Sequence, residues 1–562
     1  MYAPHILIVF CMVLVPVSAG PYFLEIYPDT WLNGDEDEYV TIAWDKNPGT
    51  CTISDGEGTI TFSPVEPGPS SCTIARNGEQ YRRVWGRYPS YEILDSSPAV
   101  PQVSHQGRFQ MGNKKDDLTL TCQGITWDSV AWPEDFKPRT GQIHFRSPDG
   151  AWNPRVLMAG GSRLTPETFQ NVSGIVSVSP DCSRQVLEDV IKNSGKTILL
   201  NIYEFTDPGL AELLCDACNR GVTVSVLMEG SPVGGVPHEE LPVIYALTMA
   251  GADVRMMDGT GEEHPPYRFN HAKYLVSDGH LVFLTTENFK EHSFPHAGFA
   301  GNRGWAVVLD NEGLAQYFSD IFLGDFGCTG VNKATGREGA WDVPVTDSFS
   351  TVFAPMVFEG AIVTPVFSPD TGILIADMIN ESSDRVWIQQ AYIKEYPKNG
   401  TNPFLAAAIN AARRGVDVRI QLDGYYYNIE GDQDNDEMTT WLNTLAAREN
   451  ISLKAKVLYP EKTGLLKVHT KGVIADDKVL VSSMNWNENS ACFNREAGAI
   501  IHSRDAASYF ATVFLLDWAE KSKSTSAGKA SVNDPEYIAL RSELTGESSG
   551  NVPGAQTVSE TE

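Results

Sequence analysis

Hydrophobic and polar positions follow two different rhythms along this chain, and the change between them divides it. Between residues 21 and about 160, apolar residues occur in short strand-like runs broken by glycine and proline, with little helical periodicity. This pattern predicts an all-β, immunoglobulin-like sandwich over residues 20–160. Beyond about residue 165, helical and strand-like segments alternate. Such alternation is typical of α/β folds, in which helices cover a sheet rich in parallel strands.

The alternating region repeats one order of elements. Its first half predicts a helix over 183–193, where apolar residues recur at helical spacing, and then a strand over 197–205. The next helix begins after Asp207, a good N-cap that is followed by a proline, and ends at Gly221. The other elements predicted for this half are a strand over 222–230, a helix near 239–250 and a strand over 252–257.

The second half predicts the same order. Its expected elements are a helix around 372–381, a strand over 385–393, a helix over 403–415, a strand over 416–424, a helix near 436–449 and a strand over 451–459. The sequence Arg220-Gly221-Val222 also recurs as Arg414-Gly415-Val416, 194 residues later. We therefore expect two pseudo-symmetric α/β units, over residues 166–345 and 346–525.

Each unit carries the same short pattern of polar residues: a histidine, a lysine two positions later, then an aspartate, then an asparagine among small or polar residues. The first set is His271, Lys273, Asp278 and Asn288, and the second set is His469, Lys471, Asp476 and Asn485. A single histidine–lysine pair is a weak signal, because most such pairs end a strand with a solvated lysine. Two copies in matched surroundings, 198 residues apart at the histidines, indicate a repeat of the whole unit.

The residue types suit chemistry at a phosphodiester. In a strand, residues i and i+2 face the same way, so each histidine would project beside its lysine. Histidine acts as nucleophile or proton donor near neutral pH, whereas lysine stays cationic and offers three donors to phosphate oxygens. The asparagines add amide donors without charge.

These motifs resemble those of the phospholipase D superfamily, whose two-copy members carry HxKxxxxD followed by GSxN or close variants. The resemblance implies that the two units pack so that their motifs form one site on a pseudo-twofold axis. It implies that one histidine attacks phosphorus to form a phosphohistidine while the other protonates the leaving alcohol. The lysines and asparagines would hold the non-bridging oxygens, the aspartates would support the local architecture, and no metal ion or cofactor is expected.

The two copies differ downstream of the motif. The second contains Asn494-Arg495-Glu496, whose glutamate matches the acidic residue that orients a histidine in the family, whereas the first reads Asn302-Arg303-Gly304. We therefore expect Glu496 to orient His469 and to leave His271 without an orienting partner. Family habit nevertheless favours His271 as the nucleophile.

The substrate is less constrained than the chemistry. Hydrolysis of a phospholipid is the first expectation, with peripheral contact at a membrane surface, and cleavage of nucleic acid is the alternative. Phosphatidyl transfer of the cardiolipin-synthase kind is a second alternative. The aromatic residues Tyr425–Tyr427, Trp305 and Trp486 would contact acyl chains, stack on bases, or simply pack. A non-catalytic binding protein is disfavoured because both motifs are complete, and no obligate protein partner is inferred.

The ends of the chain and its composition bear on where in or outside the cell the protein is found. Residues 1–19 form an apolar segment that ends in Val17-Ser18-Ala19, as in a signal peptide, so we expect a secreted protein. Eight cysteines lie beyond this segment, and their disulfide pairing stays open. Residues 526–562 are rich in Ser, Gly, Glu and Thr and are expected to be disordered. The net charge of −29 argues against a general nucleic-acid coat but not against a nuclease.

The predicted sandwich has its own resemblance. The stretch that begins "YFLEIYPDTWLNGDEDEYVTI" resembles the lamin-tail type of immunoglobulin-like domain. Such a module would position or tether the enzyme. The acidic residues 35–38 are candidates for a calcium site, although an acidic loop is more often only solvated.

Overall fold

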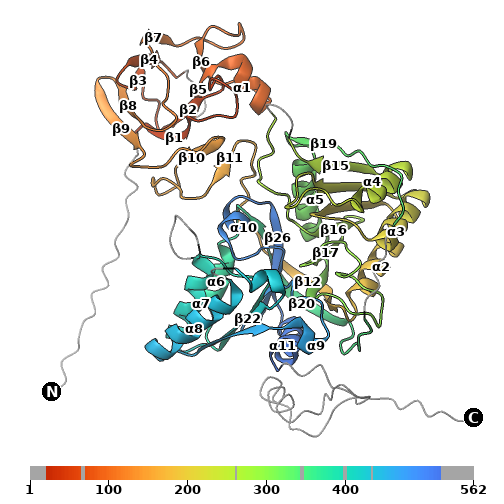
Figure 1. The fold of residues 1–562 in the computed structure, drawn as a ribbon. Helices are drawn as coiled ribbons and strands as arrows, with labels where there is room; N and C mark the ends of the chain where they lie inside the picture. The colour runs from red at the N-terminus through yellow and green to blue at the C-terminus, as the bar shows by residue number, and fades with distance from the viewer. Residues whose placement is uncertain are drawn as a thin grey trace, which may run out of the picture. The chain divides into compact units, whose positions relative to one another are not determined.

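A computed structural model describes residues 20–64, 70–259, 263–341, 347–395, 402–431 and 434–519. The signal peptide predicted over 1–19 and the disordered tail predicted over 526–562 lie outside these ranges. The chain forms two compact units, Met1–Gly161 and Ser162–Glu562. Each unit is described separately below (Figure 1).

The first unit is a sandwich of two sheets. In the part of the unit that is described, one sheet has the order β11-β10-β1-β2-β5-β6 and the other has the order β7-β4-β3-β8-β9. Its elements are β1 (Tyr22–Tyr27), β2 (Tyr39–Ala43), β3 (Cys51–Ser54), β4 (Gly58–Phe62), β5 (Ser71–Asn77), α1 (Gly78–Trp85), β6 (Tyr91–Leu94), β7 (Ser104–Gly107), β8 (Asp116–Cys122), β9 (Ile125–Trp132), β10 (Gln142–Phe145) and β11 (Leu157–Met158).

Both sheets contribute to one core, which confirms the predicted sandwich. Ile26 and Ile42 of the first sheet lie in the same buried cluster as Ile53 and Leu120 of the second. The alternation of buried and half-buried residues along β3 and β4 is the period-2 pattern from which the strands were predicted. A disulfide joins Cys51 to Cys122 across the neighbouring strands β3 and β8.

The first half of the second unit contains nine strands and four helices within its described residues. They are β12 (Phe169–Ser179), α2 (Ser183–Asn193), β13 (Thr197–Ile202), α3 (Pro208–Asn219), β14 (Thr223–Glu229), α4 (Glu240–Met249), β15 (Asp253–Met257), β16 (Tyr274–Ser277), β17 (Leu281–Thr285), β18 (Gly304–Asp310), α5 (Glu312–Phe326), β19 (Val331–Lys333) and the long strand β20 (Met356–Ser368) that leads into the second half.

The elements of the second half repeat this order. They are α6 (Leu374–Asn380), β21 (Arg385–Gln390), α7 (Pro403–Arg413), β22 (Asp417–Asp423), the short 3₁₀ turn η1 (Tyr426–Asn428), α8 (Asn435–Glu449), β23 (Leu453–Leu458), α9 (Pro460–Thr463), β24 (Lys471–Ala475), β25 (Lys478–Ser482), α10 (Glu488–Cys492), β26 (Glu496–His502) and α11 (Arg504–Trp518). The predicted N-cap is present, because the side chain of Asp207 accepts from the backbone N–H of Leu210 in α3.

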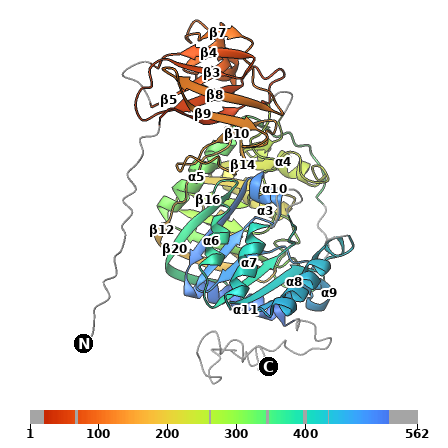
Figure 2. The same ribbon diagram turned by 90° about the vertical axis from the view of Figure 1, so that its left-hand side faces the viewer.

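One continuous sheet runs through both halves. Among the described residues its order is β19-β15-β14-β13-β16-β17-β18-β12-β20-β26-β25-β24-β21-β22-β23. The strands β13, β14 and β15 pair in parallel, as do β21, β22 and β23, whereas the strands between them pair antiparallel. The expected parallel character is therefore confined to the two outer parts of the sheet. The long strands β12 and β20 run side by side and join the halves (Figure 2).

The two halves pack face to face around β17, β18, β24, β25 and β26. A close approach at Gly472 makes this possible, because a Cβ atom there would lie 2.2 Å from the ring of Trp305. Helices α5 and α11 bury their apolar residues in the core that the halves share. Helices α6, α7 and α8 lie together over the outer strands of the second half (Figure 1).

Candidate active site

The two histidine–lysine pairs lie at the start of equivalent strands. Strand β16 begins at Tyr274, directly after Lys273, and strand β24 begins at Lys471. The spacing had suggested that the histidines lie within the strands, but they lie just before them. Each is instead held by the other half of the unit: His271 N–H donates to the carbonyl of Arg495 (2.8 Å), and His469 N–H donates to the carbonyl of Arg303 (2.9 Å).

The two arginines that provide these carbonyls are themselves buried in ion pairs. Arg495 contacts Asp325 of the first half at 2.8 Å, and Arg303 contacts Asp517 of the second half at 3.0 Å. Arg303 also contacts Asp181 at 2.8 Å. Each arginine thus comes from one half and joins a helix of the other half, α5 or α11, to the histidine backbone of that same other half, and the arrangement is repeated about the pseudo-twofold axis.

A second repeated contact holds the residue before each histidine. The carboxylate of Glu229, at the end of β14, accepts from the N–H of Asn270 at 2.5 Å. The carboxylate of Asp423, at the end of the equivalent strand β22, accepts from the N–H of Val468 at 2.7 Å. Burial raises the pKa of Glu229 to about 7 and that of Asp423 to about 6.

The orienting carboxylates cross between the halves, which corrects the expectation for Glu496. Glu496 Oε2 lies 2.8 Å from His271 Nδ1, in the first half, and not beside His469. The same carboxylate accepts from Ser483 Oγ at 2.6 Å and from Asn494 Nδ2 at 3.1 Å. The prediction was wrong because sequence register shows which half a residue belongs to, whereas packing decides which half it faces.

His469 has a carboxylate of its own, and sequence reasoning missed it. Glu287 Oε1 lies 3.2 Å from His469 Nδ1, within ion-pair distance but without the alignment of a hydrogen bond, and its other oxygen accepts from Asn302 Nδ2 at 3.0 Å. Glu287 is the third residue of Thr285-Thr286-Glu287-Asn288, which is the variable position of the GSxN pattern. An acid at this place in one copy and Met484 in the other was the signal available in the sequence.

These contacts fix how the imidazoles present themselves. A carboxylate beside Nδ1 favours the tautomer that carries its proton there, which leaves the Nε2 lone pair free. Although burial raises the pKa of Glu496, its interactions with His271, Lys273 and Ser483 outweigh that effect and keep the pKa below its usual value. Glu496 is therefore an anion that accepts the Nδ1 proton of His271.

The two lysines are buried next to the histidines. Lys273 Nζ donates to the carbonyl of His271, and Lys471 Nζ donates to the carbonyl of His469, each at 2.7 Å. Burial lowers the pKa of Lys273 to about 8 and that of Lys471 well below its ordinary value. An anion bound between the lysines would favour their charged forms, so the site is poised to take up negative charge.

Burial also lowers the pKa of both histidines. For His271 this effect is partly offset by Glu496, whereas for His469 it is increased by the neighbouring Lys471 and Lys467. His271 is itself among the groups that lower the pKa of His469, so the two imidazoles feel each other's charge. Both are therefore neutral at neutral pH in the free site.

The two motif asparagines are both buried. The side-chain oxygens of Asn288 and Asn485 have no hydrogen-bond partner among the described residues. Asn288 Nδ2 donates to Glu204 at 3.2 Å, and Glu204 also forms an ion pair with Lys290. Glu204 is another residue that the sequence did not bring forward.

The two motif aspartates lie in turns away from the imidazoles. Asp278 accepts from three consecutive backbone N–H groups, of residues 195–197, and Asp476 accepts from those of residues 383–385. Both aspartates adopt left-handed backbone conformation at φ 52°. They secure the turn between the motif strand and the next strand and do not line the site.

The aromatic candidates separate into two groups. Trp305 and Trp486 are fully buried, so they pack and do not contact substrate. Tyr426 and Tyr427 are more than half exposed, and Tyr427 Oη lies 3.3 Å from Lys467 Nζ, two residues before His469. The ring of Tyr203 lies edge-on to His271, with the ring centroids 4.8 Å apart.

The cysteines and acidic residues noted in the sequence add no metal site among the described residues. Cys215 and Cys218 lie in α3 without a disulfide. Across the described ranges, His, Cys, Asp and Glu form no group of three or more that could hold a metal ion, which includes the acidic residues 35–38. In the same ranges no helix has the length and apolarity needed to cross a membrane.

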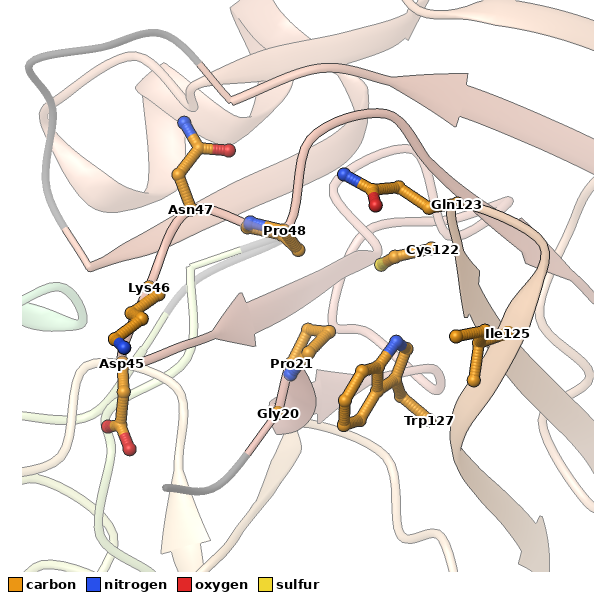
Figure 3. A pocket seen from close by; sticks show the side chains of 10 residues that line it. All are labelled: Gly20, Pro21, Asp45, Lys46, Asn47, Pro48, Cys122, Gln123, Ile125 and Trp127. Atoms are coloured by element: carbon orange, nitrogen blue, oxygen red, sulfur yellow. The ribbon is translucent and has the colours of Figure 1, made fainter.

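The sandwich unit contains a pocket of about 260 Å³ beside the disulfide (Figure 3). Its wall includes Trp127, whose side chain is half exposed, together with Ile125 and Lys46. Asn47, also in the wall, is used by the local backbone, because it donates to the carbonyl of Pro64 and accepts from the N–H of Gly49. The pocket contains no pair of groups arranged for acid–base or nucleophilic chemistry.

Comparison with known proteins finds one family model in both halves of the repeat. A family model described as cardiolipin synthase, PLD-like domain, matches residues 187–326 and 375–518, which together span just over half of the chain. No curated protein matches the sequence.

Several solved structures are similar to the chain. The phospholipase D family member Nuc from Salmonella typhimurium is 20% identical, with 30% of this chain and 100% of that chain covered and a TM-score of 0.25. Phosphatidylserine synthase from Haemophilus influenzae Rd KW20 is 14% identical, with 61% and 85% covered and a TM-score of 0.42. Polyphosphate kinase from Porphyromonas gingivalis is 12% identical, with 67% and 56% covered and a TM-score of 0.38.

Proposed function

Because this chain belongs to the PLD-like domain family of cardiolipin synthase type, we propose that it is a phosphodiesterase that works through two histidines and a phosphohistidine intermediate. The observation that carries the proposal is the crossed arrangement of His271 with Glu496 and His469 with Glu287 in one buried cluster. Two imidazoles with carboxylates at Nδ1, set beside two lysines, form a site for a phosphate ester and its two oxygen substituents.

In the first step, Nε2 of His271 attacks phosphorus, and the bond from phosphorus to the leaving alcohol oxygen breaks. His469 donates a proton to that oxygen, so the alcohol leaves neutral. We assign attack to His271 because its carboxylate is closer, at 2.8 Å against 3.2 Å for His469. His469 becomes protonated as the anionic substrate binds, because the added negative charge favours the imidazolium form.

In the second step, His469 is neutral and takes a proton from water. The water oxygen attacks phosphorus, the phosphorus–nitrogen bond breaks, and a phosphomonoester is released. Lys273 and Lys471 donate to the non-bridging oxygens in both steps, where negative charge increases in the transition state. Replacing the water with an alcohol would give transfer instead of hydrolysis, and this is the cardiolipin-synthase-like alternative.

The substrate that we propose is a phospholipid. The rim beside Lys467 presents Tyr426 and Tyr427, and the loop after β14 presents Val233 with 78% of its surface exposed. Val233 N–H donates to Tyr203 Oη, which places this loop beside His271. Exposed tyrosine and aliphatic side chains at the rim would contact the interfacial region of a bilayer, where such residues are favourable.

We also propose that the protein acts outside the cell. The apolar first segment ending at Ala19 and the disulfide between Cys51 and Cys122 support this, because disulfides persist in oxidising compartments.

The proposed function can be tested by assaying the purified mature protein in the presence of EDTA. It is offered phospholipid vesicles with labelled head groups and, in parallel, single-stranded DNA. Head-group release that falls by at least 10³-fold in both His271→Ala and His469→Ala is the expected result, since nucleophile and proton donor act as a unit.

Three outcomes would contradict parts of this proposal. DNA cleavage with the same dependence on both histidines would make the protein a nuclease. Transfer to added glycerol or phosphatidylglycerol in preference to water would make it a transferase. Activity that survives loss of either histidine would exclude the two-histidine mechanism.

A further inference from the structure

The two orienting carboxylates come from positions that are not equivalent in the repeat. Asn288 and Asn485 are equivalent, so Glu287 corresponds to Met484 in the second half. Glu496 is the first residue of β26, and the first residue of the equivalent strand β18 is Gly304. One half therefore carries its acid after the end of β17, and the other carries it at the start of β26.

The two carboxylates nevertheless have equivalent surroundings. Glu287 accepts from Asn302 Nδ2 at 3.0 Å, and Glu496 accepts from Asn494 Nδ2 at 3.1 Å. These asparagines occupy the same register, two residues before Gly304 and before Glu496 respectively. Each carboxylate also lies beside Nδ1 of the histidine of the opposite half, as described above. The two carboxylate groups thus occupy equivalent positions, although the residues that carry them are not equivalent in the repeat.

Gly304 is what makes room for Glu287. A Cβ atom on Gly304 would lie 2.4 Å from Cγ of Glu287 and 2.7 Å from its Oε1, far inside van der Waals contact. A side chain at position 304 and the glutamate at position 287 therefore exclude each other. In the second half the situation is reversed, because Met484 is buried in the apolar core of that half and leaves the place to Glu496.

We propose that the first half supplies its orienting carboxylate from position 287 instead of position 304. Glu287 is then the positioning residue of His469, and residue 304 must lack a side chain. The assignment rests on the proposed function. The carboxylate of Glu287, 3.2 Å from Nδ1 of His469, pairs with that imidazole when it is protonated and so aims its Nε2 at the leaving oxygen in the first step and at water in the second. The paired substitutions Glu287→Met and Gly304→Glu, which copy the arrangement of the second half, would supply the same carboxylate from the neighbouring strand.

A double-mutant cycle tests the exchange. The proteins compared are the wild type, Glu287→Met, Gly304→Glu and the double variant Glu287→Met/Gly304→Glu. Glu212→Met, on the exposed face of α3, is the matched control for loss of one surface carboxylate and is expected to behave as the wild type. Turnover of bis(p-nitrophenyl) phosphate and of labelled phospholipid vesicles is measured together with the melting temperature of each protein.

We expect Glu287→Met to slow steady-state turnover by on the order of 10²-fold, the lower range for a general acid–base group. Gly304→Glu alone should lower both turnover and melting temperature, because its side chain collides with Glu287. The double variant should recover at least tenfold of the turnover lost in Glu287→Met. A double variant that keeps the wild-type melting temperature but recovers nothing would overturn the proposal, as would a Glu287→Met variant with wild-type turnover.

A second measurement separates positioning from a structural role. The nitrophenolate leaving group needs little protonation, so the isosteric variant Glu287→Gln should keep its initial burst while steady-state turnover falls, since release of the phosphohistidine needs His469 as base. Equal loss of burst and turnover would mean that Glu287 only supports the fold.

The melting temperatures of these four proteins also distinguish failure of this proposal from failure of the proposed function. If the wild type acts on neither phosphodiester, the proposed function fails. The exchange is still decided, because Gly304→Glu should destabilise the protein when residue 287 is glutamate and not when it is methionine. The same destabilisation in both backgrounds would mean that the two positions do not share one space.

Discussion

At the residue scale, the chemistry of this site depends on which charged groups share a buried space. His271, Lys273 and Glu496 lie together largely shielded from solvent, so their charges and burial change one another's proton affinity. Burial disfavours the ammonium group of Lys273 and the imidazolium form of His271. In a free site of this kind, the lysine charge that binds phosphate is lost at a lower pH than for a surface lysine.

The pH dependence of kcat/KM should report this shift. Lys273 has a pKa lowered from 10.5 to about 8, so its charged form is present below pH 8 and is lost as the pH rises further. We expect kcat/KM to fall above about pH 8. In Lys273→Arg the guanidinium stays charged, and the alkaline decline should move to higher pH with a lower plateau. Lys192→Arg, at an exposed position of α2, is the control. An alkaline limb that is unchanged in Lys273→Arg would show that another group causes it.

At the element scale, the repeated contacts are between segments that lie far apart in the sequence. Arg495, at the end of the loop before β26, pairs with Asp325 near the end of α5, 170 residues earlier. The same arginine provides the carbonyl that holds the N–H of His271. The strand that carries each motif is therefore positioned by a helix of the same half through an arginine of the other half.

Breaking this contact should be costly. Arg495→Met leaves Asp325 buried without the guanidinium that contacts it at 2.8 Å, and removal of one partner of a buried pair costs about 3–5 kcal/mol. We expect a loss of that size in the free energy of unfolding, measured by urea denaturation. Arg413→Met is the matched control, because Arg413 and Glu449 form an exposed ion pair at 2.8 Å, and solvent screening leaves such pairs with little effect on stability. Equal effects of the two substitutions would contradict the role given to Arg495.

At the scale of the whole molecule, the sandwich and the catalytic unit have separate cores. The disulfide belongs to the sandwich alone and closes a segment of 71 residues. The chemistry belongs to the second unit alone, where both halves are needed to form one site. Stability and activity should therefore respond to different substitutions.

Removal of the disulfide tests this separation. Cys51→Ala/Cys122→Ala should destabilise the sandwich by about 4 kcal/mol, as expected for the loss of a cross-link that closes a loop of this length. Calorimetry should show a lower melting temperature for the sandwich and no change for the catalytic unit, with kcat/KM unchanged at 25 °C. Cys72→Ala, at a buried cysteine of the same unit without a disulfide, is the control. A parallel loss of phosphodiesterase activity would show that the two units depend on each other.

The sequence predicted most elements because their signals are local. The N-cap at Asp207 and the left-handed glycine at Gly221 fix the ends of α3 within a few residues, whatever the rest of the chain does. The sheet was harder to predict. The alternation of helices and strands correctly indicated the parallel strands β13–β15 and β21–β23, but the antiparallel strands between them have no helices to mark their direction.

The sequence by itself identified the two histidine–lysine pairs as the candidate reacting residues, because such pairs in matched units are a signal that needs no coordinates. Only the tertiary structure decided their partners. Glu496 faces His271 and Glu287 faces His469 because the two halves pack face to face, which joins residues about 200 positions apart. Spacing along the chain reports which side chains share a strand or a helix face. It does not report which side chains meet across an interface, since that depends on how two separately folded faces fit together.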